Sequence, residues 1–469
     1  MNPENRWIKK AEAIPWEEIE ERYSELFPSN KGNPAKPLRL ALGSLLIQKQ
    51  YGYSDRELVD QIMENPYYQY FVGLPGYQME APFVPSLLVE FRKRLTEEIL
   101  CEINEMIIAF NTKKDEGDDS QNQEGHRELE KSVNDEEKNS GTLILDATCA
   151  PQRIAFPQDI NLLNASREDL EKIIDAICYE YNVKKPRTYR VKARKEYLNL
   201  AKCKKRSKGK IRKAIKKQLR YVRRDLGYID IFLSEGKVLS KKHEKRLAVI
   251  REVYEQQNTM YETKKNSIPN RIVSLNQPYI RPIVRGKAKT PTEFGAKLDM
   301  SIDENGMARL ERISFDAYNE SDILIGALER YHDRYGHYPE KSLVDKIYRN
   351  RKNLAFCKEH GIRLSGPALG RPKRDNSADH KTEYNDAVER IEVERGFSLA
   401  KRKFGLGCIW TKLDETSRSS IALSVIAMNV HRITDFSFCL FIKKLFYRIM
   451  NLFSGRKAVE LSAIQTAFC

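Results

Sequence analysis

The hydrophobic positions of the first 110 residues recur at helical spacing in several short segments. Apolar residues crowd the segment 38–47. Ser54, with Glu57 three residues later, has the pattern of a capping box and opens a second helix. An Asn-Pro pair at 65–66 and a Pro-Ser pair at 85–86 open two more. This region is therefore predicted to be an all-α unit built from short helices.

From residue 142 onward the apolar residues are arranged in the runs and alternations that are typical of β-strands. The run 142–148 is apolar and is predicted to be a buried strand, with 152–156 as a candidate neighbour. Segments 295–302 and 308–315 alternate apolar and polar residues on either side of an Asp-Glu-Asn-Gly turn, which is the pattern of a β-hairpin. After them we expect a helix at 320–334, a strand ending at Asp345, a helix at 349–359, a strand at 361–364 and a helical region from about 383. Strands followed by alternating helices and strands predict an α/β domain with a mixed sheet.

Two segments interrupt this order. Residues 112–141 are polar and acidic, with almost no apolar residue to bury, so they are predicted to form a disordered linker. Residues 165–265 have helical periodicity and enter the α/β domain as a long insert. The predicted organisation is a helical domain at 1–111, the linker at 112–141, the α/β domain with its insert at 142–455, and a tail at 456–469.

The positive charge of the chain is concentrated in the insert. The 469 residues carry a net charge of +16. Residues 184–224 hold 20 Lys and Arg and one Glu, a local charge of +19, which leaves −3 for the rest of the chain. Such density attracts a polyanion, and the tyrosines at 189, 197 and 221 suit stacking on unpaired bases. We predict DNA contacts here, with Lys204, Lys205 and Arg206 as candidates; the alternative is a solvated helix face.

Two further regions carry candidate phosphate contacts. Several short helices in succession are typical of a helix-turn-helix-like DNA module, and the fourth N-terminal helix carries Arg92 and Arg94. A basic loop before the hairpin carries Arg281, Arg285 and Lys287. The alternative for the N-terminal region is a small helical bundle with a solvated basic face.

Cysteine spacing and hydropathy exclude several classes of protein. The eight cysteines form neither a Cys-x-x-Cys pair nor a zinc-binding spacing, which predicts reduced thiols. No apolar segment opens the chain, and no stretch reaches the roughly 18 charge-poor residues of a membrane span. The nearest, 421–450, is interrupted by charged residues and is predicted to be a buried helix. We expect a cytoplasmic protein without a membrane partner.

Three carboxylates stand where strands or a helix would present them to a cation. Asp146 ends the apolar run 142–145, Asp345 follows 342–344, and Glu394 lies in the last helical region. Ligand-binding groups in open α/β sheets gather at the carboxyl ends of strands. Carboxylate oxygens are hard ligands that suit Mg²⁺. Together the three predict a divalent-cation site, although any one alone would more often be a surface or capping acid.

Glu394 is flanked by two cations on one helical face. At about 100° per residue, Arg390 and Lys401 both fall within about 40° of Glu394. These cations suit gripping phosphate oxygens beside a metal, and exposed salt bridges are the alternative. Glu392 competes for the ligand role but lies about 200° around the helix, so only one of the two faces the metal. The Arg-x3-Glu-x6-Lys spacing selects Glu394 and leaves Glu392 solvated.

These residues belong to segments that resemble the DDE transposases of bacterial insertion sequences, in particular the insertion-sequence-five family with its N-terminal transposase domain. The resemblance runs through 66–71, 85–95, 145–148, 345–351, 364–367 and 401–406. The related signature also has a Tyr three residues before the Arg, where this chain has Ala387, with Tyr384 one turn earlier. This departure concerns contact with the DNA end and leaves the carboxylates untouched.

The resemblance implies an RNase H-like catalytic domain in which Asp146, Asp345 and Glu394 are the catalytic residues and bind two Mg²⁺ or Mn²⁺ ions. Asp146 would bridge both ions, and the other two would each bind one. The implied activity is that of a DNA transposase, which binds the inverted-repeat ends of its element, hydrolyses a phosphodiester and joins the freed 3′-hydroxyl to target DNA. A homodimer on double-stranded DNA at the nucleoid is expected, because two ends are joined. The alternatives are a metal-dependent nuclease without strand transfer and an inactive DNA-binding relic.

Overall fold

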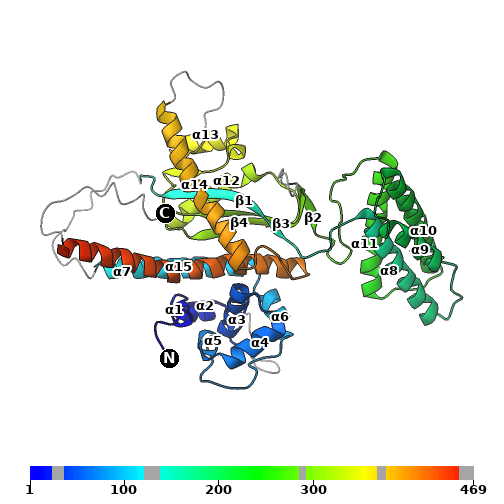
Figure 1. Cartoon of the computed structure of the whole chain (residues 1–469), viewed down its shortest axis with the longest axis horizontal. Helices are drawn as coiled ribbons and strands as arrows, with labels where there is room; N and C mark the ends of the chain where they lie inside the picture. Colours follow the sequence, from blue (N-terminus) through cyan, green and yellow to red (C-terminus); the bar gives the residue numbers. More distant parts are fainter. Residues whose placement is uncertain (24–35, 121–137, 285–291, 367–376, 454–469) are drawn as a thin grey trace.

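The structure is a computed structural model that describes residues 1–23, 36–120, 138–284, 292–366 and 377–453. Its parts are a cluster of N-terminal helices, a central mixed sheet covered by helices, and a helical lobe that stands to one side (Figure 1). Among the described residues, no helix is long and apolar enough to cross a lipid bilayer. The six cysteines whose surroundings are described are free thiols.

The N-terminal part is all-α, as predicted. The capping box is present, because the Ser54 side chain accepts from the Glu57 backbone N–H and the Glu57 side chain accepts from the Ser54 N–H. Asn65 caps the next helix, which has Pro66 in its first turn. The helices are α1 (Arg6–Glu12), α2 (Trp16–Tyr23), α3 (Leu38–Tyr51), α4 (Asp55–Glu64), α5 (Pro66–Phe71), α6 (Leu87–Arg94) and α7 (Glu97–Ser120). Since α7 is helical to Ser120, the linker predicted from residue 112 starts later, and 121–137 lie outside the described residues.

A six-stranded mixed sheet forms the centre of the molecule. The strands are β1 (Thr142–Pro151), β2 (Arg281–Val284), β3 (Thr292–Ile302), β4 (Ala308–Ser314), β5 (Lys341–Leu343) and β6 (Arg363–Leu364). Their order is β2-β3-β1-β5-β6, and β4 pairs with β3. β3 is antiparallel to its neighbours, whereas β1, β5 and β6 are parallel. The predicted hairpin is confirmed, but the strand expected at 152–156 is wrong, because only Gln152 forms a single bridge, with Ile409.

Helices cover both faces of the sheet. They are η2 (Glu320–Ile323), α12 (Leu324–Tyr335), η3 (Lys346–Tyr348), α13 (Arg351–Glu359), α14 (Ser377–Lys403) and α15 (Asp414–Phe453). Alternate residues of β1 point to opposite faces. Leu143 and Leu145 join a core cluster with α12, and Ile144 joins the cluster that contains α14 and α15. Asp146 therefore lies on the face of β1 that is covered by α14.

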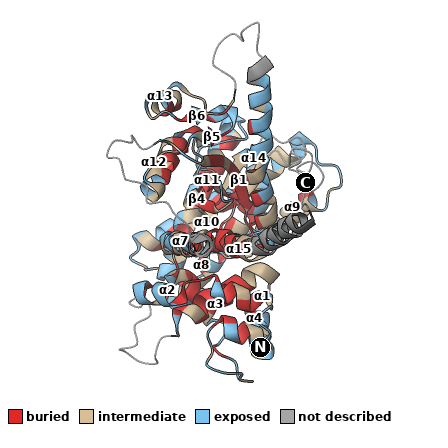
Figure 2. Cartoon of the chain, turned by 90° about the vertical axis from the view of Figure 1, so that its left-hand side faces the viewer, coloured by how far each residue is buried: buried red, intermediate tan, exposed pale blue. Residues whose placement is uncertain are grey.

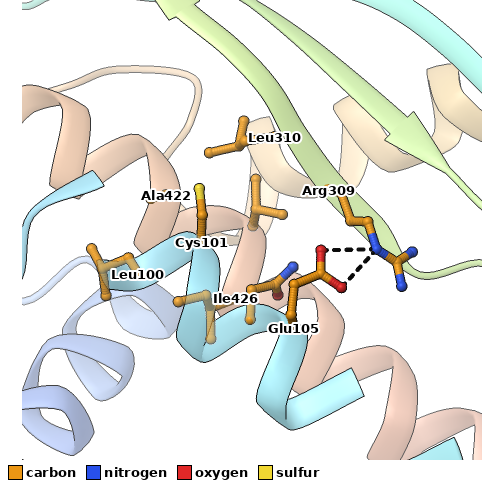
Figure 3. A pocket seen from close by; sticks show the side chains of 9 residues that line it. Leu100, Cys101, Glu105, Arg309, Leu310, Ala422 and Ile426 are labelled. Atoms are coloured by element: carbon orange, nitrogen blue, oxygen red, sulfur yellow. Dashed lines mark hydrogen bonds and ion pairs between the residues drawn. The ribbon is translucent and has the colours of Figure 1, made fainter. Parts of the chain in front are cut away.

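The N-terminal helices and the sheet share one hydrophobic core. Helix α15 packs against α3, α6, α7 and β4, and one cluster of buried side chains extends from Trp7 to Val430. Figure 2 shows this buried material running from the N-terminal helices through α15 toward the sheet. A small cavity lies where α7, β4 and α15 meet, and there Arg309 Nε donates to Glu105 at 3.0 Å (Figure 3). The N-terminal helices are thus packed firmly against α15 and the sheet and are not a separately tethered unit.

The insert is a separate helical lobe with its own core. It comprises α8 (Asp159–Glu180), α9 (Arg190–Ala201), α10 (Lys208–Ser234) and α11 (Lys241–Thr263), and its buried apolar residues form a distinct cluster. It stands apart from the sheet in Figure 1. The chain leaves at Pro151 and returns at Arg281, and both residues pair with Gly295 of β3. Only glycine fits there, because an added Cβ would lie 2.8 Å from Gln152 N.

Candidate active site

Asp146 lies on β1, and Asp345 follows the end of the neighbouring parallel strand β5. β1 pairs with β5 in the register Thr142–Lys341, Leu143–Ser342 and Ile144–Leu343. Two residues further along the same register, Asp146 stands opposite Asp345. Asp345 follows the carboxyl end of β5, as predicted, and caps η3 by accepting from Lys346 N at 2.7 Å. Asp146 does not end its strand, because β1 continues to Pro151 through its pairing with β3.

The Asp146 carboxyl group is partly buried, and its neighbours shift its pKa in opposite directions. Burial raises its pKa, while the Ala147 N–H, which donates to Oδ1 at 2.8 Å, and the Arg390 guanidinium lower it. The neighbouring carboxylates of Asp345 and Glu320 raise the pKa again. Like charges brought this close favour either a proton or a cation between them.

Helix α14 brings cations to the same place. Arg390 Nη1 lies 3.5 Å from Asp345 Oδ1, and Lys401 Nζ donates to Thr148 Oγ1 at 2.8 Å. Thr148 is on β1 and on the same face as Asp146. Of the two cations on this face of α14, Arg390 thus lies beside Asp345, and Lys401 contacts β1 two residues beyond Asp146.

Glu394 and Glu392 lie on opposite sides of α14. Glu394 is exposed and shares its side of the helix with Arg390 and Lys401. Glu392 is half-buried, and its carboxylate accepts from Arg432 Nη2 at 2.9 Å and lies 3.7 Å from Arg395. The prediction that Glu392 is solvated is thus wrong, since it holds α14 against α15. Its engagement there leaves Glu394 as the acid beside the two cations.

The donor set suits a divalent cation only in part as the side chains stand. Within the described ranges, no group of three or more His, Cys, Asp or Glu side chains is gathered closely enough to hold a metal ion. Asp146 and Asp345 are hard oxygen donors whose mutual repulsion a cation would relieve. Glu394 is exposed on α14 and is not gathered with this pair among the described residues.

A buried carboxyl group behind the site was missed by sequence reasoning. Asp299 of β3 is fully buried and accepts from the hydroxyls of Tyr318 and Tyr348, the latter at 3.3 Å. Burial raises the pKa of Asp299 to about 6. Tyr348 belongs to η3, the turn capped by Asp345, so Asp299 helps to fix that turn. The only signal in the sequence was an acid within an alternating hairpin strand, at a position that burial makes unusual.

The predicted phosphate contacts outside α14 fall into three groups. Arg92 is buried and forms an ion pair of 2.5 Å with Asp55, so its guanidinium is occupied inside the N-terminal helices, whereas Arg94 is exposed. Arg281 is largely buried, donates to the Pro278 carbonyl and lies 3.5 Å from Asp316. These placements do not support DNA contacts by Arg92 or Arg281. Arg285 and Lys287 lie outside the described residues.

The insert presents its cations outward. Lys204, Lys205 and Arg206 are exposed in the turn between α9 and α10, although Arg206 also donates to the Ala201 carbonyl at 2.7 Å. Glu196, the one acid of the basic segment, is occupied by Lys217 at 2.8 Å and by the Tyr221 hydroxyl at 3.0 Å. Exposed cations recur along one face of α10 at Lys210, Lys213, Lys216, Arg220 and Arg223. We call these five residues the α10 stripe, which spans about 20 Å.

Comparison with known families assigns the chain to a class. Residues 343–431 match the family model described as a transposase DDE domain, and residues 1–94 match the one described as a transposase domain, DUF772. The chain belongs to the DDE transposases of insertion sequences. The DDE match contains Asp345, Glu394 and both α14 cations, whereas Asp146 precedes it.

One curated relative and the solved structures complete the comparison. The chain is 30% identical over 166 residues to the uncharacterized protein ORF8 in the nfe locus of Rhizobium meliloti, an alignment that covers 34% of this chain and 69% of that protein. No solved structure gives a significant match.

Proposed function

We propose that this chain binds the inverted-repeat ends of its own insertion element, cuts a phosphodiester bond at each end and transfers the freed 3′-hydroxyl to target DNA. The observation that supports the proposal is the nearness of Asp146, on β1, to Asp345, which follows the parallel strand β5, with Arg390 of α14 acting on both carboxylates. The strand order, with an antiparallel β1-β3-β4 unit followed by parallel β5 and β6, supports an RNase H-like catalytic domain.

Asp146, Asp345 and Glu394 are the residues that would hold Mg²⁺ or Mn²⁺, two ions in all. When bound, such ions lower the pKa of an attacking water and neutralise charge that develops on the phosphate. The chain itself orients the DNA: Arg390 and Lys401 flank the carboxylates and are placed to hold phosphate oxygens. Burial and the Ala147 N–H keep the Asp146 carboxylate in a fixed position on its strand.

Double-stranded DNA is the proposed partner over a wider surface. The α10 stripe and the 204–206 turn supply exposed cations whose neighbouring acid, Glu196, is already paired. Such a surface gains affinity by releasing counterions from the phosphate backbone. Because two ends must meet, the active form is a homodimer on DNA at the nucleoid of the cytoplasm.

The proposal is tested by measuring DNA cleavage and DNA binding in three variants, one at Asp146 and one at each of Glu394 and Glu392. Asp146→Asn and Glu394→Gln are expected to reduce cleavage of end-labelled DNA by about 10³-fold or more, with binding in gel shifts largely kept. Glu392→Gln is the matched control, because it changes the same chemical group two residues away and should retain most cleavage. Full cleavage by Asp146→Asn would overturn the site. Cleavage without joined products in the unmodified protein would leave a nuclease instead of a transposase.

A further inference from the structure

One tryptophan differs from the other two in its exposure. Trp7 and Trp16 are buried at 3% and 7%, whereas Trp410 is 66% exposed. The Arg153 guanidinium lies over the Trp410 ring, 3.4 Å from its centroid. One face of the indole is therefore covered by a cation and the other faces solvent. Exposure alone would be ordinary, but here the exposed ring carries a guanidinium on one face.

The Trp410 loop is fastened to the strand that carries Asp146. Ile409 N donates to the Pro151 carbonyl at 2.8 Å, and Arg153 N donates to the Ile409 carbonyl at 2.9 Å. The Gln152 side chain also donates to the Thr411 carbonyl. These contacts place the Trp410 loop at the carboxyl end of β1, where Pro151 is five residues beyond Asp146.

The charge of this corner of the molecule suits a nucleic acid. The two segments that build it are 147–158 and 395–413, and together they contain no acid. Their cations are Arg153, Arg395, Lys401, Arg402, Lys403 and Lys412. These cations favour phosphate groups and disfavour a basic peptide, although Asp414 and Glu415 follow directly after the second segment.

We propose that Trp410, backed by Arg153, is a stacking platform for an unpaired base of the DNA that leaves the catalytic site. Aromatic side chains bind bases of any sequence through their ring faces, and an arginine on the opposite face adds a cation–π contribution. Arg153 also fixes the orientation of the indole, so less conformational freedom is lost when a base arrives. The inference rests on the proposed function, because it requires that the chain binds DNA ends.

Trp410 provides its own optical probe, because the other two tryptophans are buried. The full chain is titrated with a duplex of the element's end, either blunt or with a short single-stranded flank, while tryptophan fluorescence and its quenching by acrylamide are recorded. We expect the flanked duplex to quench the fluorescence and to protect it from acrylamide, and the blunt duplex to do neither. Trp410→Ala should bind the flanked duplex about tenfold more weakly and the blunt duplex unchanged.

Two further variants separate stacking from charge and from folding. Trp410→Phe keeps an aromatic ring and should retain most of the preference for the flanked duplex. Lys412→Gln removes a cation of the same corner and should weaken both duplexes equally. Equal affinity of Trp410→Ala and the unmodified protein for the flanked duplex, or an equal loss on both duplexes, would overturn the platform while leaving end binding intact. Failure of the unmodified protein to bind either duplex would instead overturn the proposed function, and the platform with it.

Discussion

Both the N-terminal helices and the insert lobe offer cations for contact with DNA, yet the structure uses these cations differently. In the N-terminal helices, Arg92 is buried against Asp55, and Lys49 Nζ donates to Ser420 Oγ of α15 at 2.6 Å. In the insert, the α10 stripe is exposed and the one nearby acid is already paired. A cation in sequence predicts phosphate contact only where the fold leaves its charge facing outward.

The two regions also differ in how they are supported. The N-terminal helices share their hydrophobic core with α15 and the sheet, whereas the lobe has a core of its own. Substitutions among the N-terminal cations should therefore act on the stability of the whole body. Substitutions on the lobe surface should act on DNA affinity and leave the body unchanged.

The largest expected effect is on DNA affinity when the stripe is neutralised. Lys213→Gln, Lys216→Gln and Arg220→Gln together should weaken DNA binding about 100-fold at low salt, because three phosphate contacts are lost. The slope of log affinity against log salt should fall by about 0.9 for each lost contact. Fluorescence anisotropy at several salt concentrations measures both quantities.

A matched triple variant on α11 of the same lobe tests whether position or net charge matters. Lys241, Lys242 and Lys245 are equally exposed, so changing them to Gln removes the same charge from another helix. We expect a small loss of affinity. If both triple variants weaken binding alike, the lobe attracts DNA through diffuse charge and the stripe has no special role.

A smaller effect, on stability, is expected at Arg92. Arg92→Met keeps the aliphatic stem but leaves the Asp55 carboxylate partly buried without its partner, which should cost about 2–4 kcal/mol. Thermal unfolding and DNA affinity are measured on the same sample, with the exposed Arg94→Met as control. If Arg92→Met weakens DNA binding without lowering Tm, Arg92 contacts DNA and the N-terminal helices belong to the DNA-binding surface.

The smallest effect concerns a buried acid inside the lobe. Asp225 is fully buried, and its carboxylate has no hydrogen bond within the described part of the chain. Burial, then Glu171, raises its pKa to about 7, against the opposing effect of Arg167, Arg224 and Arg190. Folded Asp225 thus keeps its proton to higher pH than the unfolded chain does, and the lobe loses stability as pH rises from about 4 to 7.

Asp225→Asn removes this titration. The variant should gain stability relative to the unmodified protein across that range, by about 1.4 kcal/mol per pH unit at most, and the difference should be flat above pH 7. Apparent Tm measured from pH 5 to 8 gives the comparison. A difference that does not change with pH would mean that Asp225 is already ionised and paired in solution.

Local patterns were sufficient for much of the fold. The hairpin of β3 and β4, the capping box of α4 and the helical insert were all predictable, because each depends on residues close in sequence. The strand expected at 152–156 was wrong because that segment pairs instead with a loop more than 250 residues away, through Gln152 and Ile409. Apolar composition alone does not show which partner a segment will find.

The same limit applies to the candidate site. The spacing of Arg390 and Lys401 on α14 follows from helical periodicity, and the rule that ligand groups gather at the carboxyl ends of strands put Asp146 and Asp345 together. The partner of Glu392 is Arg432, and the partners of Asp299 are two tyrosines, all brought together only by tertiary packing. Tertiary packing therefore decides whether an acidic side chain is solvated, paired or buried.

The stem of the lobe has a consequence for how such elements diversify. Because Pro151 and Arg281 flank the same glycine of β3, the polypeptide departs and comes back across a gap of about 10 Å, two strand spacings. A folded unit whose two termini lie about 10 Å apart could replace the lobe without changing the spacing of the strands that carry the carboxylates. The lobe could therefore be exchanged as one unit while the sheet that carries Asp146 keeps its strand order.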